Sequence, residues 1–305
     1  MKYKNIPNTY LYASQMILGQ MRISKLNITE LEMLIETALK GGINFFDHAD
    51  IYGKGQSERL FGEVLKKHPD WRKQMIIQSK CGIRQGFYDS SKGYIISSVE
   101  GILSRLGIDY LDVLLLHRPD ALIDPLEVKE AFDYLEANHK VQYFGVSNMN
   151  SMQIELLQKH LTQKLVFNQL QFSLVHASMI DQGINVNMQK QEAIDRDGSI
   201  FDYSRLKEIT IQAWSPLQAS WEQGSFLNHP DYAKLNQVLD ELSAAKKTSK
   251  SAIAISWIMR HPAFIQPILG TASIQHLQEM MAASEIELTK KEWYDLYLSV
   301  NRLLP

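Results

Sequence analysis

The sequence predicts a (β/α)8 TIM barrel with an inserted polar loop and extra C-terminal helices. Short apolar runs alternate with longer segments of helical spacing, and there are eight such runs. Runs that are apolar on both faces suit a parallel sheet covered on both sides. Eight strand–helix units in 305 residues fill one barrel. The alternative is an open doubly wound sheet, which normally carries a GxGxxG turn after its first strand, and the chain has none.

The predicted elements follow one another along the whole chain. The eight strands are expected at 14–19, 43–48, 75–80, 111–117, 142–147, 165–171, 210–215 and 264–270. Helices are expected at 29–40, 57–67, 92–106, 125–138, 151–160, 231–245 and 273–283. In the first helix, Thr29 and Glu32 have the spacing of a capping box, and Gly41-Gly42 marks the end.

Three segments are additional to the eight strand–helix units. Residues 183–205 are long and polar and interrupt the sixth unit, residues 249–260 add a second helix after 231–245, and residues 289–301 form an amphipathic tail helix. We expect the tail helix to pack on the barrel flank or to cover one mouth. A long loop without a pattern inside a compact domain is usually functional or disordered. We therefore expect 183–205 to line the substrate pocket and to be mobile without ligand. All of these segments belong to a single expected domain, residues 1–305.

Composition excludes several classes of protein. The chain is 45% hydrophobic and 22% charged with a net charge of −2, which is typical of a globular protein and not of a nucleic-acid or membrane-surface binder. The single cysteine, Cys81, cannot form an internal disulfide. No apolar run marks a signal peptide or a bilayer span. We therefore expect a cytoplasmic monomer or weak homo-oligomer with a small-molecule substrate.

Four consecutive strand ends carry polar groups, and barrel active sites lie at those ends. The second strand ends at Asp47 with Tyr52 just beyond it, the third at Lys80, the fourth at His117, and the fifth at the pair Ser147-Asn148. Asp47 and Lys80 come from neighbouring strands and are expected to pair, which leaves Tyr52 beside an ammonium group.

That arrangement predicts a proton donor. A free tyrosine has a pKa near about 10, and a neighbouring ammonium lowers it. We therefore expect Tyr52 to be a general acid with a reduced pKa, with His117 as a second donor to the same oxygen. Such a group protonates a carbonyl oxygen while a hydride arrives at its carbon. No HxH or HxxxH motif supports a metal site, and none is expected.

Seven motifs resemble the aldo-keto reductase family, and HADIYG, SKCG and LLLHRPD resemble its bacterial YdhF-like branch. They occur in the family's order from about residue 10 to the end of the chain: GGINFFDHADIYGKGQSERLFGE, SKCG, LLLHRPD, FGVSN, NQLQFSL, AWSPL and PILGTASIQHLQEM. The resemblance implies an NADPH-dependent reduction of aldehydes and ketones without a metal. It assigns Tyr52 as the proton donor, assisted by Lys80, Asp47 and His117.

The resemblance also implies a cofactor site. Ser147, Asn148 and Gln169 match positions that bind the nicotinamide carboxamide, and Trp214 matches the aromatic residue that stacks on its ring. Ser215 and Leu217 match positions along the pyrophosphate. The further positions assigned to the cofactor are Gly19, Gln20, Met21, Asp47, Gly270, Thr271, Ser273, His276 and Glu279.

The chain departs from the family pattern where the adenosine phosphate is expected. Gly270 and His276 stand where many members have Lys and Arg, and residues 267–280 contain neither. Met280 replaces a common Asn, and Met21 replaces a common Trp. A guanidinium is the strong ligand for phosphate, so its absence from this segment weakens the case for NADP selectivity and makes NADH use possible. NADPH is still the expected cofactor, because Thr271 and Ser273 offer hydroxyl donors and a protonated His276 would add positive charge.

Two other functions are compatible with the same residues. Some relatives act as cofactor-sensing regulatory subunits of membrane channels, with little turnover. On the same fold, Lys80 is also a candidate for a Schiff-base lyase, as in aldolases.

Overall fold

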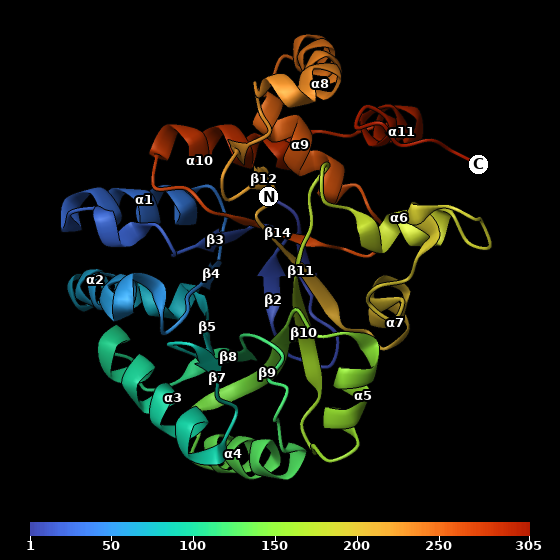
Figure 1. Cartoon of the computed structure of the whole chain (residues 1–305). Coiled ribbons are helices and arrows are strands. Elements are labelled where there is room, and N and C mark those ends of the chain that lie inside the picture. The colour runs from blue at the N-terminus through green and yellow to red at the C-terminus, as the bar shows by residue number, and fades with distance from the viewer.

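The computed structural model describes residues 1–305 and has a closed barrel of eight parallel strands at its centre (Figure 1). Around the barrel the strands follow chain order, and the last pairs with the first. They are β3 (Ile17–Gly19), β4 (Phe45–Asp47), β5 (Ile76–Cys81), β8 (Leu111–Leu116), β9 (Val141–Ser147), β10 (Leu165–Gln171), β11 (Thr210–Trp214) and β14 (Gln266–Leu269). Each lies within one of the eight predicted strands, allowing a residue at its ends, so the barrel prediction is confirmed.

Helices surround the strands on all sides (Figure 1). They are α1 (Ile28–Lys40), α2 (Gln56–Lys67), α3 (Lys92–Leu106), α4 (Pro125–Ala137), α5 (Ser151–Gln158), α6 (Ser178–Ile184), α7 (Ile200–Leu206), α8 (Ala233–Lys246), α9 (Lys250–Met259), α10 (Ile274–Met281) and α11 (Lys290–Leu298). Buried apolar side chains fill the layer between strands and helices. No helix is both long enough and apolar enough to cross a membrane.

The start of α1 differs from the prediction. The capping box is formed by Asn27 and Glu30, not by Thr29 and Glu32. The Asn27 side chain accepts the Glu30 N–H at 3.0 Å, and the Glu30 carboxylate accepts the Asn27 N–H at 2.9 Å. Both pairs have the correct spacing, but Glu32 is engaged by Lys67 and His68 at the end of α2.

The barrel interior is closed at its amino-terminal end by a hairpin that the sequence did not reveal. Strands β1 (Tyr3–Asn5) and β2 (Tyr12–Ser14) pair antiparallel. The hairpin buries Ile6 and Leu11 against inward side chains of the barrel strands, including Phe45 and Phe167. Because this end is filled, a ligand enters from the carboxyl ends of the strands.

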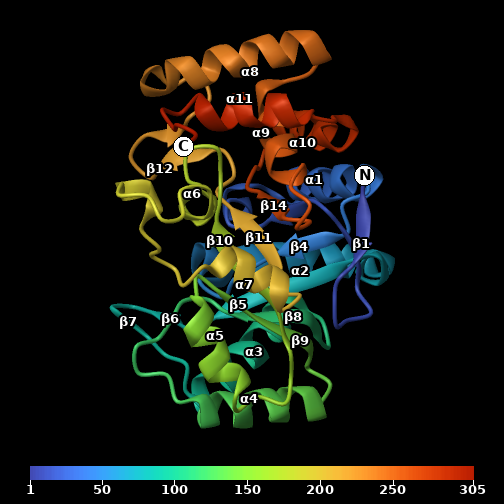
Figure 2. The same ribbon diagram turned by 90° about the vertical axis from the view of Figure 1, so that its right-hand side faces the viewer.

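The tail helix packs on the barrel flank, which was one of the two positions expected for it. In Figure 2, α8 and α11 lie at the outer edge of the molecule, on the side of α9 and α10. The rings of Trp257 in α9 and Trp293 in α11 stack at 4.9 Å, and each indole N–H donates to the other residue's carbonyl oxygen. This pairing holds the end of the chain away from the barrel mouth.

Residues 183–205 contain more regular structure than expected. Helix α6 ends at Ile184 and α7 begins at Ile200, so the irregular part is 185–199, with one short turn at Gln191–Ala193. The carboxylate of Asp195 accepts the backbone N–H groups of Asp197, Gly198 and Ser199. The polar composition of this segment thus reflects a turn whose backbone N–H groups are hydrogen-bonded by the segment's own side chains.

Candidate active site

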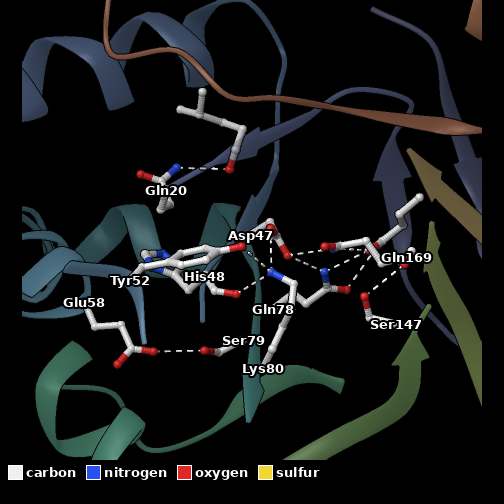
Figure 3. Close-up of polar contacts among 12 residues, drawn as sticks. Gln20, Asp47, His48, Tyr52, Glu58, Gln78, Ser79, Lys80, Ser147 and Gln169 are labelled. Carbon is white, nitrogen blue, oxygen red and sulfur yellow. Dashed lines mark hydrogen bonds and ion pairs between the residues drawn. The ribbon is translucent and has the colours of Figure 1, made fainter. Parts of the chain in front are cut away.

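The side chains of Asp47, Lys80 and Tyr52 meet at the carboxyl ends of β4 and β5 (Figure 3). The Lys80 ammonium lies 2.8 Å from the Asp47 carboxylate, 2.7 Å from the carbonyl oxygen of His48 and 3.1 Å from the Tyr52 hydroxyl. Lys80 is fully buried and the Asp47 side chain is 3% exposed. A buried charge is costly unless it is paired and hydrogen-bonded, and this ammonium has three oxygen acceptors.

Tyr52 is presented by a tight turn. It begins a 3-10 turn, Tyr52–Gly55, in which Gly53, Lys54 and Gly55 all have positive φ. Glycine adopts this conformation without strain, and a Cβ on Gly53 would also lie 2.7 Å from the Cβ of Ser24. The turn therefore places the phenol over Lys80 before α2 begins.

The predicted direction of the Tyr52 pKa is wrong. Burial raises the pKa of the phenol above its ordinary value, and the Lys80 ammonium offsets only part of this effect. Burial also opposes the charge on Lys80, but Asp47 and Tyr52 outweigh it, so the pKa of Lys80 is raised. At neutral pH the pair is therefore a protonated phenol that accepts a hydrogen bond from a protonated amine.

His117 lies beside Tyr52 at the end of β8. The two ring centroids are 6.2 Å apart and the rings are nearly perpendicular. Burial, with the nearby charges of Lys80 and Arg118, holds the pKa of His117 well below its ordinary value. The imidazole is therefore neutral and carries one N–H, and its Nδ1 has no partner in the protein. A neutral imidazole of this kind can act as a second hydrogen-bond donor to a bound oxygen.

A ladder of glutamine amides holds Asp47 from the other side, and sequence reasoning missed two of its members. The amide nitrogens of Gln78 and Gln169 donate to one Asp47 oxygen at 2.6 and 3.0 Å (Figure 3). Both also donate to the side-chain oxygen of Gln212. Gln78 and Gln212 are fully buried. The available signal was a glutamine two residues before Lys80 and before Trp214, on the same inward face of each strand.

A second buried carboxylate ties β5 to the helices behind it. Ser79 points away from the barrel interior and donates to Glu58 at 2.9 Å, and Arg105 in α3 donates to the other Glu58 oxygen at 2.6 Å. Glu58 is fully buried. This contact fixes the position of β5, and therefore of Lys80, relative to α2, which follows Tyr52.

One cavity of about 850 Å³ opens over this cluster, within the usual range for ligand sites. Tyr52, Asp47 and His117 line it. Most of the predicted cofactor positions also line it, namely Gly19, Met21, Ser147, Asn148, Gln169, Trp214, Ser215, Leu217, Gly270, Thr271, His276 and Glu279.

Two of the predicted cofactor residues do not line the cavity. Gln20 is fully buried and its amide donates to the carbonyl oxygen of Leu18. Ser273 caps α10, where its hydroxyl accepts the His276 N–H. In these positions both side chains have structural roles.

The expectation that 183–205 lines the substrate pocket is wrong, since no residue of that segment borders the cavity. Part of the cavity wall is formed instead by the hairpin of β12 (Gln218–Ser220) and β13 (Gly224–Ser225). This hairpin carries Trp221 between its two strands. The hairpin follows β11, so it lies at the mouth, whereas the insertion folds into α6 and α7 beside the barrel (Figure 1).

Three cations that sequence reasoning missed also line the cavity, namely Arg22, Arg118 and Lys250. Arg22 follows β3 and donates to the carbonyl oxygen of Gly270, and Lys250 begins α9. Lys250 lies 2.8 Å from Asp240 and 2.6 Å from the side-chain oxygen of Asn228. The segment 267–280 lacks Lys and Arg, but other elements bring positive charge to its side of the cavity.

Comparisons with known proteins agree with this geometry. Residues 15–297 match the Aldo/keto reductase family. The chain is 34% identical to "Uncharacterized oxidoreductase YcsN" of Bacillus subtilis (95% of each chain) and 34% identical to "Oxidoreductase YdhF" of Escherichia coli (92% and 91%). It is 32% identical to the "6-dehydroglucose reductase" of Agrobacterium fabrum, over 94% of each chain.

A solved structure shows the same fold. The thermostable aldo-keto reductase Tm1743 superposes with a TM-score of 0.79 over 98% of this chain and 100% of that one, at 24% identity. The similarity to YdhF confirms the predicted bacterial branch. The family match over nearly the whole chain and these oxidoreductase relatives lead to one conclusion: this protein belongs to the aldo-keto reductase family and is an NAD(P)H-dependent oxidoreductase.

Proposed function

We propose that the protein reduces aldehydes or ketones to alcohols with NADPH, and that Tyr52 donates the proton. The observation that carries the proposal is the contact of the Tyr52 hydroxyl with the buried Lys80 ammonium, at the floor of a large cavity. A nicotinamide cofactor, when bound, supplies the hydride for the carbonyl carbon. The protein must then deliver a proton to the carbonyl oxygen.

The cluster suits proton donation at neutral pH. The raised pKa of Tyr52 keeps the phenol protonated until a carbonyl oxygen gains negative charge. As the proton leaves, the Lys80 ammonium donates to the phenolate and stabilises it, while Asp47 holds the ammonium in place. The neutral His117 imidazole is proposed to donate to the same carbonyl oxygen and to orient the substrate.

One end of the cavity offers groups suited to a nicotinamide ring and its carboxamide. Trp214 offers an aromatic face, held by the hydrogen bond from its indole N–H to the Asn148 oxygen at 3.1 Å. Asn148 in turn donates to the Ser147 hydroxyl at 2.8 Å. With the Gln169 amide, these groups give donors and acceptors suited to a carboxamide. We therefore assign the nicotinamide end to Ser147, Asn148, Gln169 and Trp214.

The opposite end is proposed to hold the adenosine phosphate. A Cβ on Gly270 would lie 3.0 Å from the Arg22 guanidinium, so this side chain occupies the space beside the position where many relatives have a lysine. Lys250, His276 and the first turn of α10 border the same region. A guanidinium and a helix N-terminus both bind phosphate, which favours NADPH over NADH.

Two alternatives make different predictions. A Schiff base requires a neutral amine, but Lys80 has a raised pKa and three oxygen acceptors, which disfavours the lyase. A regulatory subunit would bind the cofactor without useful turnover.

The test is oxidation of NADPH, followed by absorbance, across a panel of aldehydes and ketones and repeated with NADH. We expect saturable turnover with aldehydes and a higher kcat/KM with NADPH. Tight cofactor binding without turnover on any carbonyl would instead favour the regulatory function. Among the relatives, a 6-dehydroglucose reductase is similar over most of the chain, so aldehyde sugars belong in the panel.

A further inference from the structure

Arg118 follows His117 directly and forms no hydrogen bond or ion pair through its side chain. It lines the cavity and is half-buried, and its guanidinium carbon lies 5.7 Å from the centre of the Trp214 ring. A cation–π contact with an aromatic face leaves the N–H donors of the guanidinium free for another partner. The structure therefore holds five charged donors at the edge of the active site without an acceptor.

The carboxylates of the cavity wall do not satisfy Arg118. Asp47 is occupied by Lys80, Gln78 and Gln169. Glu279 lies on α10, where Gln275 donates to it. No other carboxylate lines the cavity.

The surroundings of Arg118 strengthen its interaction with any anion that enters. The same cavity also has apolar side chains in its lining, among them Ile51, Ile83 and Trp221. A substrate seated among them displaces water, and charge pairs are stronger where water is excluded. The positive charge of Arg118 already reaches the reacting groups, since it favours the ionised phenol of Tyr52 and the neutral imidazole of His117.

We propose that Arg118 binds an anionic group of the substrate, so that the preferred substrates are carbonyl compounds carrying a carboxylate or a phosphate. This inference rests on the proposed function. A guanidinium pairs with either oxyanion through two parallel hydrogen bonds, whereas an uncharged chain leaves its donors without partners. The anion would hold the substrate while Tyr52 and His117 act on its carbonyl oxygen.

Two matched pairs of aldehydes test the proposal with the NADPH-loaded enzyme. The first pair is 4-formylbenzoate and its methyl ester, and the second is glyceraldehyde 3-phosphate and glyceraldehyde. In each pair the carbonyl is unchanged and the charge differs. We expect the kcat/KM of at least one charged member to exceed that of its neutral partner by at least tenfold, mainly through a lower KM. The pair that shows the larger ratio identifies the anion.

Arg118→Met should reduce that ratio to near one, and Arg118→Lys should retain part of it because a lysine keeps the charge without the bidentate geometry. The matched control is Arg59→Met, since Arg59 is exposed on α2, outside the cavity, and has no ion pair. This control makes the same change of charge and should keep the parent ratio. The KM of the charged aldehyde should also rise with ionic strength in the parent and not in Arg118→Met.

Several results would overturn the proposal. One is a parent ratio of one or less in both pairs, and another is a ratio unchanged in Arg118→Met. A tenfold loss of NADPH affinity in Arg118→Met, measured by cofactor fluorescence, would place the guanidinium on the cofactor instead. Absence of turnover on every aldehyde would refute the proposed function itself, which distinguishes that failure from failure of this inference.

Discussion

Replacing Lys80 by Met tests the buried ion pair at the centre of the site. The change removes the partner of a carboxylate that is 3% exposed, and breaking a buried pair costs about 3–5 kcal/mol. Asp47 keeps two amide donors at 2.6 and 3.0 Å, so we expect the lower end, about 3 kcal/mol. For a chain of 305 residues this lowers Tm by about 5 °C.

The assay is thermal unfolding of three variants, with turnover measured in parallel. Asp47→Asn combined with Lys80→Met removes both charges and should recover most of the lost Tm while turnover stays abolished. Lys291→Met is the control, because its partner Asp295 forms an exposed pair on α11, and its Tm should stay close to that of the parent. The reasoning is refuted if Lys80→Met leaves Tm unchanged or if the double variant is no more stable than Lys80→Met.

Two other substitutions test the electrostatics around the site. Burial raises the pKa of Asp50 from 3.8 to about 6, so the stability present below about pH 4 is lost as pH rises through 6. The free energy of unfolding of Asp50→Asn should exceed that of the parent by on the order of 2 kcal/mol at pH 7 and equal it below about pH 4. Urea titrations at several pH values measure this difference, and a difference that does not change with pH would contradict the prediction. Arg22→Met should weaken NADPH binding at least tenfold and NADH binding little. An equal loss for both cofactors, by calorimetry, would place Arg22 on the pyrophosphate.

The sequence predicted the barrel because each strand is a short apolar run that ends in turn or polar residues. It predicted the cluster of Asp47, Lys80 and Tyr52 because parallel strands end at the same edge of the barrel. Both predictions need only the position of a residue along its own strand, and the order of apolar and polar residues in the sequence gives that position directly.

The remaining features depend on groups that meet across the barrel. The amides of Gln78 and Gln212 come from strands far apart in sequence, and Arg22 reaches Gly270 across 248 positions. The net direction of the Tyr52 pKa could not be predicted either, because it depends on how far burial outweighs the nearby ammonium. Residues 183–205 were misplaced since their helix α7 buries only Ile200, Phe201 and Ser204, too short a pattern to recognise.

The most direct test of the proposed chemistry is the single-turnover rate of Tyr52→Phe with NADPH and an aldehyde that the parent enzyme reduces. The substitution removes the hydroxyl that Lys80 contacts at 3.1 Å and keeps the ring. The account predicts a rate at least about 10²-fold below that of the parent enzyme, with the dissociation constant for NADPH within about twofold. A near-parental rate would show that Tyr52 does not donate the proton.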